Sequence, residues 1–139
     1  MFVDDVAEYL GTQIPELTYN VDGGGNVFVD WIADEPAQAV GVYSLPGLEA
    51  DSGLPYDPVE FQIIVRGDAG SAVAASWAQK VYSQLHGLAA VTMAGSGTYV
   101  VFVICQQSSP NRIGDDDNGR PRYSLDFRAE ILNPTAHRS

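Results

Sequence analysis

The segment 59-VEFQIIVR-66, followed by the turn 67-GDAGS-71, decides the fold of this 139-residue chain. The segment alternates at its start and is apolar through most of its end, which predicts a strand buried mostly on both faces. After the turn, apolar residues recur every three or four positions from residue 71 to 86, which predicts a helix with one apolar stripe. Gly87 stands where a left-handed C-cap would end that helix. The stripe consists of Val73, Ala74, Trp77, Ala78, Val81, Tyr82 and Leu85.

Further elements are predicted on both sides of this unit. Before it, we expect an amphipathic helix over residues 2–10 that Gly11 ends, strands over 26–32 and 39–45, a flexible loop at glycines 23–25 and an exposed loop over 46–58. After it, we expect strands over 89–93, 99–106 and 122–132, with a polar hairpin at Asn118-Gly119 before the last strand. The last strand alternates throughout, so one of its faces is expected in the core and the other in water.

This order of elements predicts an α+β fold, in which two helices pack on one face of a largely antiparallel mixed sheet. The composition, 45% hydrophobic and 18% charged, is that of a globular domain. We expect a single domain over residues 1–132 and a flexible C-terminal tail over 133–139. The longest apolar run, residues 99–105, is far shorter than the ~20 residues that cross a bilayer, so no membrane association is expected.

The chain carries 18 acidic and seven basic residues, a net charge of −11, and their distribution is uneven. Residues 1–65 contain twelve acids and no Lys or Arg, whereas residues 66–139 contain six acids and seven bases. This excess of carboxylates argues against a partner held through nucleic-acid phosphates. The uneven distribution has two interpretations: an acidic half that serves solubility, or opposite faces suited to head-to-tail contact between copies.

The sequence offers no set of residues arranged for catalysis or metal binding. Asp115, Asp116 and Asp117 lack the alternating spacing and the sixth-position glycine of a calcium loop, so we interpret them as a solvated hairpin tip. The single cysteine, Cys105, lies in an apolar strand and is expected to be an inert core thiol. His86 is expected in the last turn of a helix. We therefore expect no enzyme, no bound metal and no cofactor.

Basic residues gather near the C-terminus. Within 17 positions lie four of the seven, Arg112, Arg120, Arg122 and Arg128. One interpretation is a solvated sheet face on which they pair with Asp126 and Glu130. The other is a contact surface for the acidic first half of a neighbouring copy. The candidate interface for subunits or partners comprises Arg112, Asp115, Asp116, Asp117, Arg120, Arg122 and Arg128.

Four stretches share their order and spacing with one family of virion proteins. They are the opening helix VDDVAEYL (3–10), the central strand and helix (61–67 and 74–88), the turn QQSSP (106–110), and the closing hairpin GDDDNGRP (114–121) with its strand (123–127). Together they resemble the tail terminator and minor capsid (head–tail joining) proteins of long-tailed bacteriophages, from about residue 2 to 132.

The resemblance implies a structural protein of the phage neck, a virion component assembled in the host cytoplasm. Proteins of this family form a ring of six subunits at the head-proximal end of the tail tube, where the ring stops tube growth and meets the head side. The implied partners are further copies of the chain, the tail tube protein and the head-side connector protein. DNA would pass through the lumen without specific binding. Two alternatives stay open: another connector or stopper protein, or a small α+β ligand-binding domain with a pocket near Trp77 or the Arg122/Arg128 face.

Overall fold

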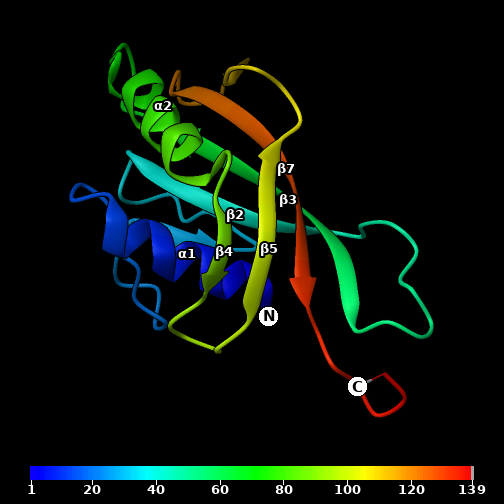
Figure 1. The fold of residues 1–139 in the computed structure, drawn as a ribbon. Coiled ribbons are helices and arrows are strands. Elements are labelled where there is room, and N and C mark those ends of the chain that lie inside the picture. The colour runs from blue at the N-terminus through cyan, green and yellow to red at the C-terminus, as the bar shows by residue number, and fades with distance from the viewer. Residues whose placement is uncertain (139) are drawn as a thin grey trace.

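The computed structural model describes residues 1–138, which form two helices and seven strands (Figure 1). The elements are α1 (Phe2–Gln13), β1 (Val27–Val29), β2 (Ala39–Leu45), β3 (Tyr56–Arg66), α2 (Val73–Leu85), β4 (Ala89–Thr92), β5 (Tyr99–Cys105), β6 (Asn111–Asp115) and β7 (Pro121–Leu132). The strands form an open sheet in the order β1-β2-β3-β7-β5-β4, and β6 pairs with β7. The β1–β2 pair is parallel and the other pairs are antiparallel. The predicted α+β fold is therefore confirmed.

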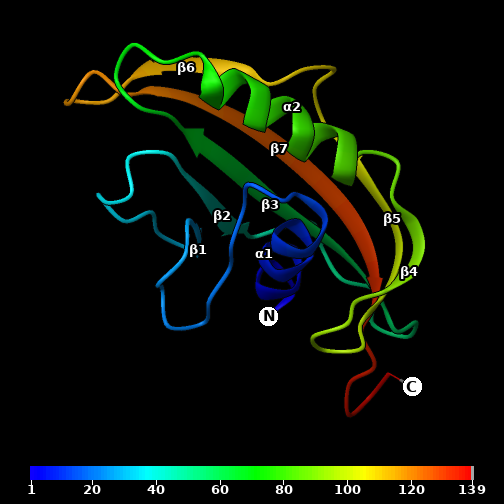
Figure 2. The same ribbon diagram turned by 90° about the vertical axis from the view of Figure 1, so that its left-hand side faces the viewer.

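The longest ladder of the sheet joins β3 to β7 and pairs all eleven residues of β3 in continuous register. In β3 the side chains of Phe61, Ile63 and Val65 are buried, whereas the residues between them are less covered. The prediction that this strand is buried mostly on both faces is therefore wrong. The reason is that both helices cover the same face of the sheet, where Figure 2 shows them in front of the strands.

The hydrophobic core lies between the two helices and this face of the sheet. The rings of Phe61 and Phe127 stack inside it, with centroids 5.1 Å apart and ring planes 12° apart. Burying a side chain of this size contributes roughly 1.5–3 kcal/mol, so the core fixes both helices to the sheet. Val73, predicted in the apolar stripe of α2, is instead exposed at the first turn of that helix. The helices contribute Val3, Val6, Ala7, Leu10, Ala74, Ala78, Val81 and Leu85 to the core.

Several element boundaries differ from the predicted ones. Gly11 does not end α1, which continues to Gln13. Its missing side chain lets another segment approach, since an ideal Cβ there would lie 3.1 Å from the backbone nitrogen of Tyr19. β1 is confined to three residues, and β3 already begins at Tyr56, inside the predicted exposed loop. β6 was not predicted, because its one large apolar residue, Ile113, gives no alternation and the strand pairs through its backbone.

The loop at glycines 23–25 makes close backbone contacts with the segment before it, and its predicted flexibility stays a prediction. Gly23 has a left-handed φ of 83°. At Gly25, a Cβ would overlap the carbonyl oxygen of Thr18, so only glycine lets the two backbones meet. Asn26 secures the contact, because its side-chain Oδ1 accepts a hydrogen bond from Thr18 N at 2.7 Å and its own N donates to Thr18 O at 2.9 Å.

The last described residues fold back onto the start of β3. Arg138 donates hydrogen bonds to both carboxylate oxygens of Asp57, at 2.6 and 3.1 Å, and Asn133 adds a third at 2.7 Å. These hydrogen bonds hold the pKa of Asp57 below its ordinary value, and those from Arg138 have the largest effect. The domain limits 1–132 and a flexible tail over 133–139 stay predictions, and residue 139 lies outside the described residues.

Candidate functional site

The acidic run of the candidate interface forms the tip of the β6–β7 hairpin. Asp116 Oδ1 accepts hydrogen bonds from the backbone N–H groups of Asn118 (2.9 Å) and Arg120 (3.0 Å), and Asp116 Oδ2 accepts one from Arg120 Nε (2.9 Å). These bonds, above all the backbone bond from Arg120, lower the pKa of Asp116. Asp115 and Asp117 are exposed. A solvated tip is thus confirmed for these two residues, whereas Asp116 shapes the turn.

Arg120 reaches from this hairpin to the loop between β1 and β2. Its Nη1 donates to the carbonyl oxygen of Asp34 at 2.8 Å, and its Nη2 donates to the Asp34 carboxylate at 2.6 Å. The Asp34 carboxylate is the first cause of a raised pKa at Arg120. Because Arg120 is only 7% exposed, its guanidinium is engaged inside its own chain. A contact of Arg120 with a neighbouring copy stays a prediction.

A second arginine, Arg66 at the end of β3, holds the same loop and was not predicted as a functional residue. Its Nε donates to the carbonyl of Ala37 at 2.9 Å, and its Nη2 donates to three carbonyls within residues 33–36, at 2.6 to 3.2 Å. Burial, and then the nearby charge of Arg120, lowers the pKa of Arg66. Both arginines converge on the carbonyl of Asp34. The β1–β2 loop is therefore fixed to the sheet next to the hairpin.

The other candidate arginines keep their side chains at least partly exposed. Arg112 pairs with Asp115 at 2.7 Å, and the two side chains are 53% and 48% exposed. Arg122 lies on the neighbouring strand, at the same end of the hairpin. Arg128 lies farther along β7, with its guanidinium carbon 5.9 Å from the ring centroid of Phe102, a cation–π distance. The structure thus brings Arg112 and Arg122 together and sets Arg128 apart.

A solvated sheet face would pair these arginines with Asp126 and Glu130. Among residues 1–138, neither Arg122 nor Arg128 forms an ion pair with either of those carboxylates. The pairing expected for a solvated sheet face is therefore not formed by these two arginines, and Arg128 instead lies over the ring of Phe102.

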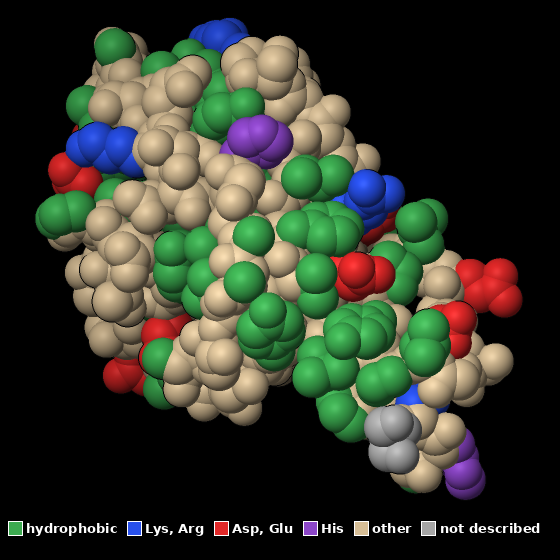
Figure 3. All heavy atoms as spheres, viewed as in Figure 1, with side chains coloured by type: hydrophobic (Ala, Val, Ile, Leu, Met, Phe, Trp, Pro, Cys, Tyr) green, Lys and Arg blue, Asp and Glu red, His purple; other side chains and the backbone are tan. Residues whose placement is uncertain are grey.

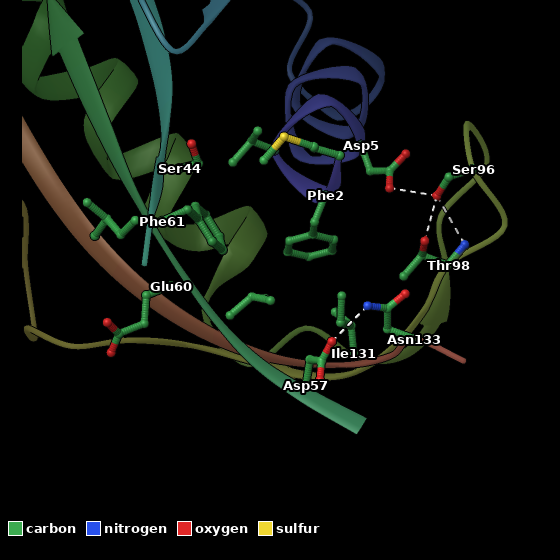
Figure 4. Close-up of a pocket in the computed structure, with 14 residues that line it drawn as sticks. Phe2, Asp5, Ser44, Asp57, Glu60, Phe61, Ser96, Thr98, Ile131 and Asn133 are labelled. Carbon is green, nitrogen blue, oxygen red and sulfur yellow. Dashed lines mark hydrogen bonds between the residues drawn. The ribbon is translucent and has the colours of Figure 1, made fainter. Parts of the chain in front are cut away.

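A cavity of about 360 Å³, lined by both apolar and polar side chains, opens between the start of α1, the first half of β3 and the end of β7 (Figure 4). Phe2 and Phe61 line it edge to face, with ring centroids 5.9 Å apart. The carboxylate of Asp5 accepts a hydrogen bond from Ser96 Oγ at 2.6 Å, and Asp57 is held by the C-terminal residues described above. The lining includes no His or Lys that could serve as a base for a nucleophile.

The remaining candidate groups are held in structural contacts. His86 Nδ1 accepts a hydrogen bond from the backbone N–H of Cys105 at 3.0 Å, and the imidazole stacks on Tyr82 with centroids 5.1 Å apart. Burial raises the pKa of the Cys105 thiol, which is partly buried against the core. Trp77 also packs against the core.

No group of three or more His, Cys, Asp or Glu within residues 1–138 is placed to hold a metal ion. In the same part of the chain, neither helix has the length and apolar character needed to cross a membrane.

The chain matches known proteins at two levels. A family model described as "Bacteriophage tail terminator protein" matches residues 9–133. Among solved structures, a chain of the structure titled "Virion of native gene transfer agent (GTA) particle" gives a TM-score of 0.50 at 22% identity and covers 91% of this chain and 83% of that chain. A second solved chain gives a TM-score of 0.48 at 17% identity, covering 92% and 89%. No curated protein matches this sequence. The first structural likeness is one of fold, whereas the family match rests on most of the sequence.

Proposed function

Because the chain belongs to the bacteriophage tail terminator family, we propose that six copies form a ring that ends the tail tube and joins it to the head-side connector. Family membership makes the chain a structural component of the phage virion, in its tail or neck. The match over residues 9–133 is the observation that carries the proposal, since it includes both helices, in part or whole, and all seven strands of the fold. The proposed role is mechanical and needs no catalytic group.

The distribution of charge supports a ring of identical copies. A closed ring with more than two members uses heterologous contacts, so each subunit needs two unlike surfaces. Residues 1–65 supply twelve acids and no Lys or Arg, and the β6–β7 hairpin supplies the partly exposed Arg112 and Arg122. Opposite charges on two surfaces of one chain favour head-to-tail contact.

A ring at the end of the tail would also surround the DNA that leaves the head. With a net charge of −11 per subunit, its wall would repel phosphates rather than hold them. The exposed Asp115 and Asp117 at the hairpin tip are the side chains we propose for this wall. DNA would thus pass through the lumen without specific binding.

The test is the length of the tails that form without this chain. Phage in which the coding sequence carries an early stop codon are expected to make tail tubes longer than the wild type and without heads, as seen by negative-stain electron microscopy. Supplying the intact chain from a plasmid should restore both the length and the joining. Tubes of normal length that lack heads would instead assign the chain to a head-side stopper or another connector, and so contradict termination.

A further inference from the structure

An exposed apolar surface lies at the end of the sheet away from the hairpin. Leu54, Tyr56 and Tyr99 are 62%, 40% and 37% exposed there, and they line an open groove of about 500 Å³. Figure 3 shows hydrophobic side chains gathered over this part of the molecule, with acidic side chains among them. We term this surface the apolar–acidic patch, and its members are Glu49, Asp51, Leu54, Tyr56, Pro58, Tyr99, Val101 and Glu130. Contiguous exposed apolar surface of this kind typically marks a protein contact.

A second surface, at the opposite end of the sheet, has the complementary character. The outer edge of β6, which we term the β6 edge, carries Ile113, 38% exposed, next to the exposed Arg112. The register between β6 and β7 shifts at this point, so Ile113 has no partner residue across the ladder. The β6 edge thus presents one apolar side chain and one cation to the outside.

The two surfaces are placed for a contact that continues from copy to copy. Tyr56 of the patch pairs with Leu132 at one end of the β3–β7 ladder, and β6 pairs with residues 121–124 at the other end. About ten residue steps of roughly 3.3 Å separate them, which is about 30 Å. Two surfaces this far apart cannot contact each other within one chain. The patch of one copy can contact the β6 edge of a neighbouring copy, as heterologous assembly requires.

We propose that the apolar–acidic patch of one copy receives the β6 edge of the next copy. Ile113 enters the groove beside Leu54 and Tyr99, and Arg112 exchanges its exposed partner Asp115 for the acids of the patch. Arg112 can make this exchange because its present ion pair is half exposed. The inference rests on the proposed ring and names the contact that closes it. A second copy is favoured as the occupant because the chain itself supplies both the apolar side chain and the opposite charge.

Cysteine cross-linking tests this contact. In a Cys105→Ser background, Leu54→Cys and Ile113→Cys chains are prepared separately, mixed and oxidised. Mixed chains are expected to form disulfide-linked dimers, and neither variant alone should do so, because the contact is heterologous. A chain carrying both cysteines should give a ladder up to six copies. Val73→Cys, 39% exposed at the start of α2, is the matched control that should cross-link with neither partner.

The outcomes separate this contact from the ring itself. The mass of the Cys105→Ser chain, alone and on purified tails, is measured first. A ring of six without the Leu54–Ile113 cross-link overturns this contact and leaves the proposed function standing. A chain that stays monomeric in both settings overturns the proposed function and this contact together. A cross-link from the Leu54→Cys chain to the tail tube protein in its place overturns the assignment to a second copy.

Charge exchange gives an independent readout. Arg112→Glu and Glu49→Arg are each expected to weaken association about fivefold, and the two together should restore it to near the wild-type value. Lys80→Glu is the matched control, because Lys80 is also an exposed cation paired with a carboxylate, that of Glu16 at 2.6 Å, but lies on α2. Equal weakening by Lys80→Glu, or no recovery in the double variant, counts against the contact.

Discussion

Arg66→Met is expected to destabilise the fold through the loop between β1 and β2. The substitution keeps an unbranched apolar side chain but removes the guanidinium and its four hydrogen bonds to the carbonyls of residues 33, 34, 36 and 37. A hydrogen bond to a charged group contributes about 1.5–3 kcal/mol. The four bonds do not add in full, because three share one nitrogen and the loop carbonyls can turn toward water. We expect a net loss of about 3 kcal/mol, the equivalent of one to two such bonds, against a typical stability of about 5–15 kcal/mol.

The assay is urea unfolding followed by circular dichroism, with amide hydrogen exchange over residues 33–38 as a local readout. Arg66→Lys keeps the charge but loses the planar fork, so its loss should fall between the wild type and Arg66→Met. Arg112→Met is the matched control. Its side chain is 53% exposed, and we expect a change within about 0.5 kcal/mol.

Two results would refute this reasoning about Arg66. One is a loss below about 1 kcal/mol for Arg66→Met, because it would mean that water replaces the guanidinium at little cost. The other is a loss of the expected size without faster exchange in residues 33–38, because the stabilisation would then not act through the loop.

Three further predictions concern acid stability, DNA passage and the core. Because Arg138 lowers the folded-state pKa of Asp57, the pair stabilises the fold at pH values above the unfolded carboxyl pKa of about 4, and this stabilisation is lost as the pH falls. In Asp57→Asn, the free energy of unfolding should therefore fall less steeply as the solution is made acidic. Identical pH slopes for the variant and the wild type would contradict this. Asp115→Asn with Asp117→Asn should slow DNA ejection from assembled phage at low salt; unchanged ejection removes that role. Phe127→Ala should lower the free energy of unfolding in urea by about 3–5 kcal/mol, since the ring is fully buried. A loss under about 1 kcal/mol would mean that the core collapses into the space that the ring leaves.

Elements with a strong period were predictable from the sequence. The alternation of β7 and the single stripe of α2 each report burial against a partner, and both were found within one or two residues of their true ends. β6 could not be predicted, because the strand is held by backbone pairing, which produces no periodic pattern of apolar residues in the sequence. The prediction that Gly11 ends α1 was wrong, because its small size allows the close approach of Tyr19 and does not mark the end of the helix. The resemblance to phage tail terminators is confirmed by the family match.

The candidate surface was predictable in composition but not in the roles of its members. The count of arginines near the C-terminus pointed to Arg112, Arg120, Arg122 and Arg128. Arg120, however, is buried against Asp34, 86 positions away. Such pairing depends on tertiary approach, which spacing along the chain does not show. Tyr99 was not predicted as a surface residue. An aromatic residue at the start of an apolar strand is typical of a core, but Tyr99 lies exposed.

The most direct test of the account is the mass of the chain in solution, measured by light scattering across a concentration series and again with purified tail tubes. The account predicts a species of about 89 kDa, six times the 14.9 kDa of one chain, that binds the end of the tube and stops its growth. A chain that remains at 14.9 kDa at every concentration, and that leaves the tubes uncapped, would contradict the ring and its role as a terminator.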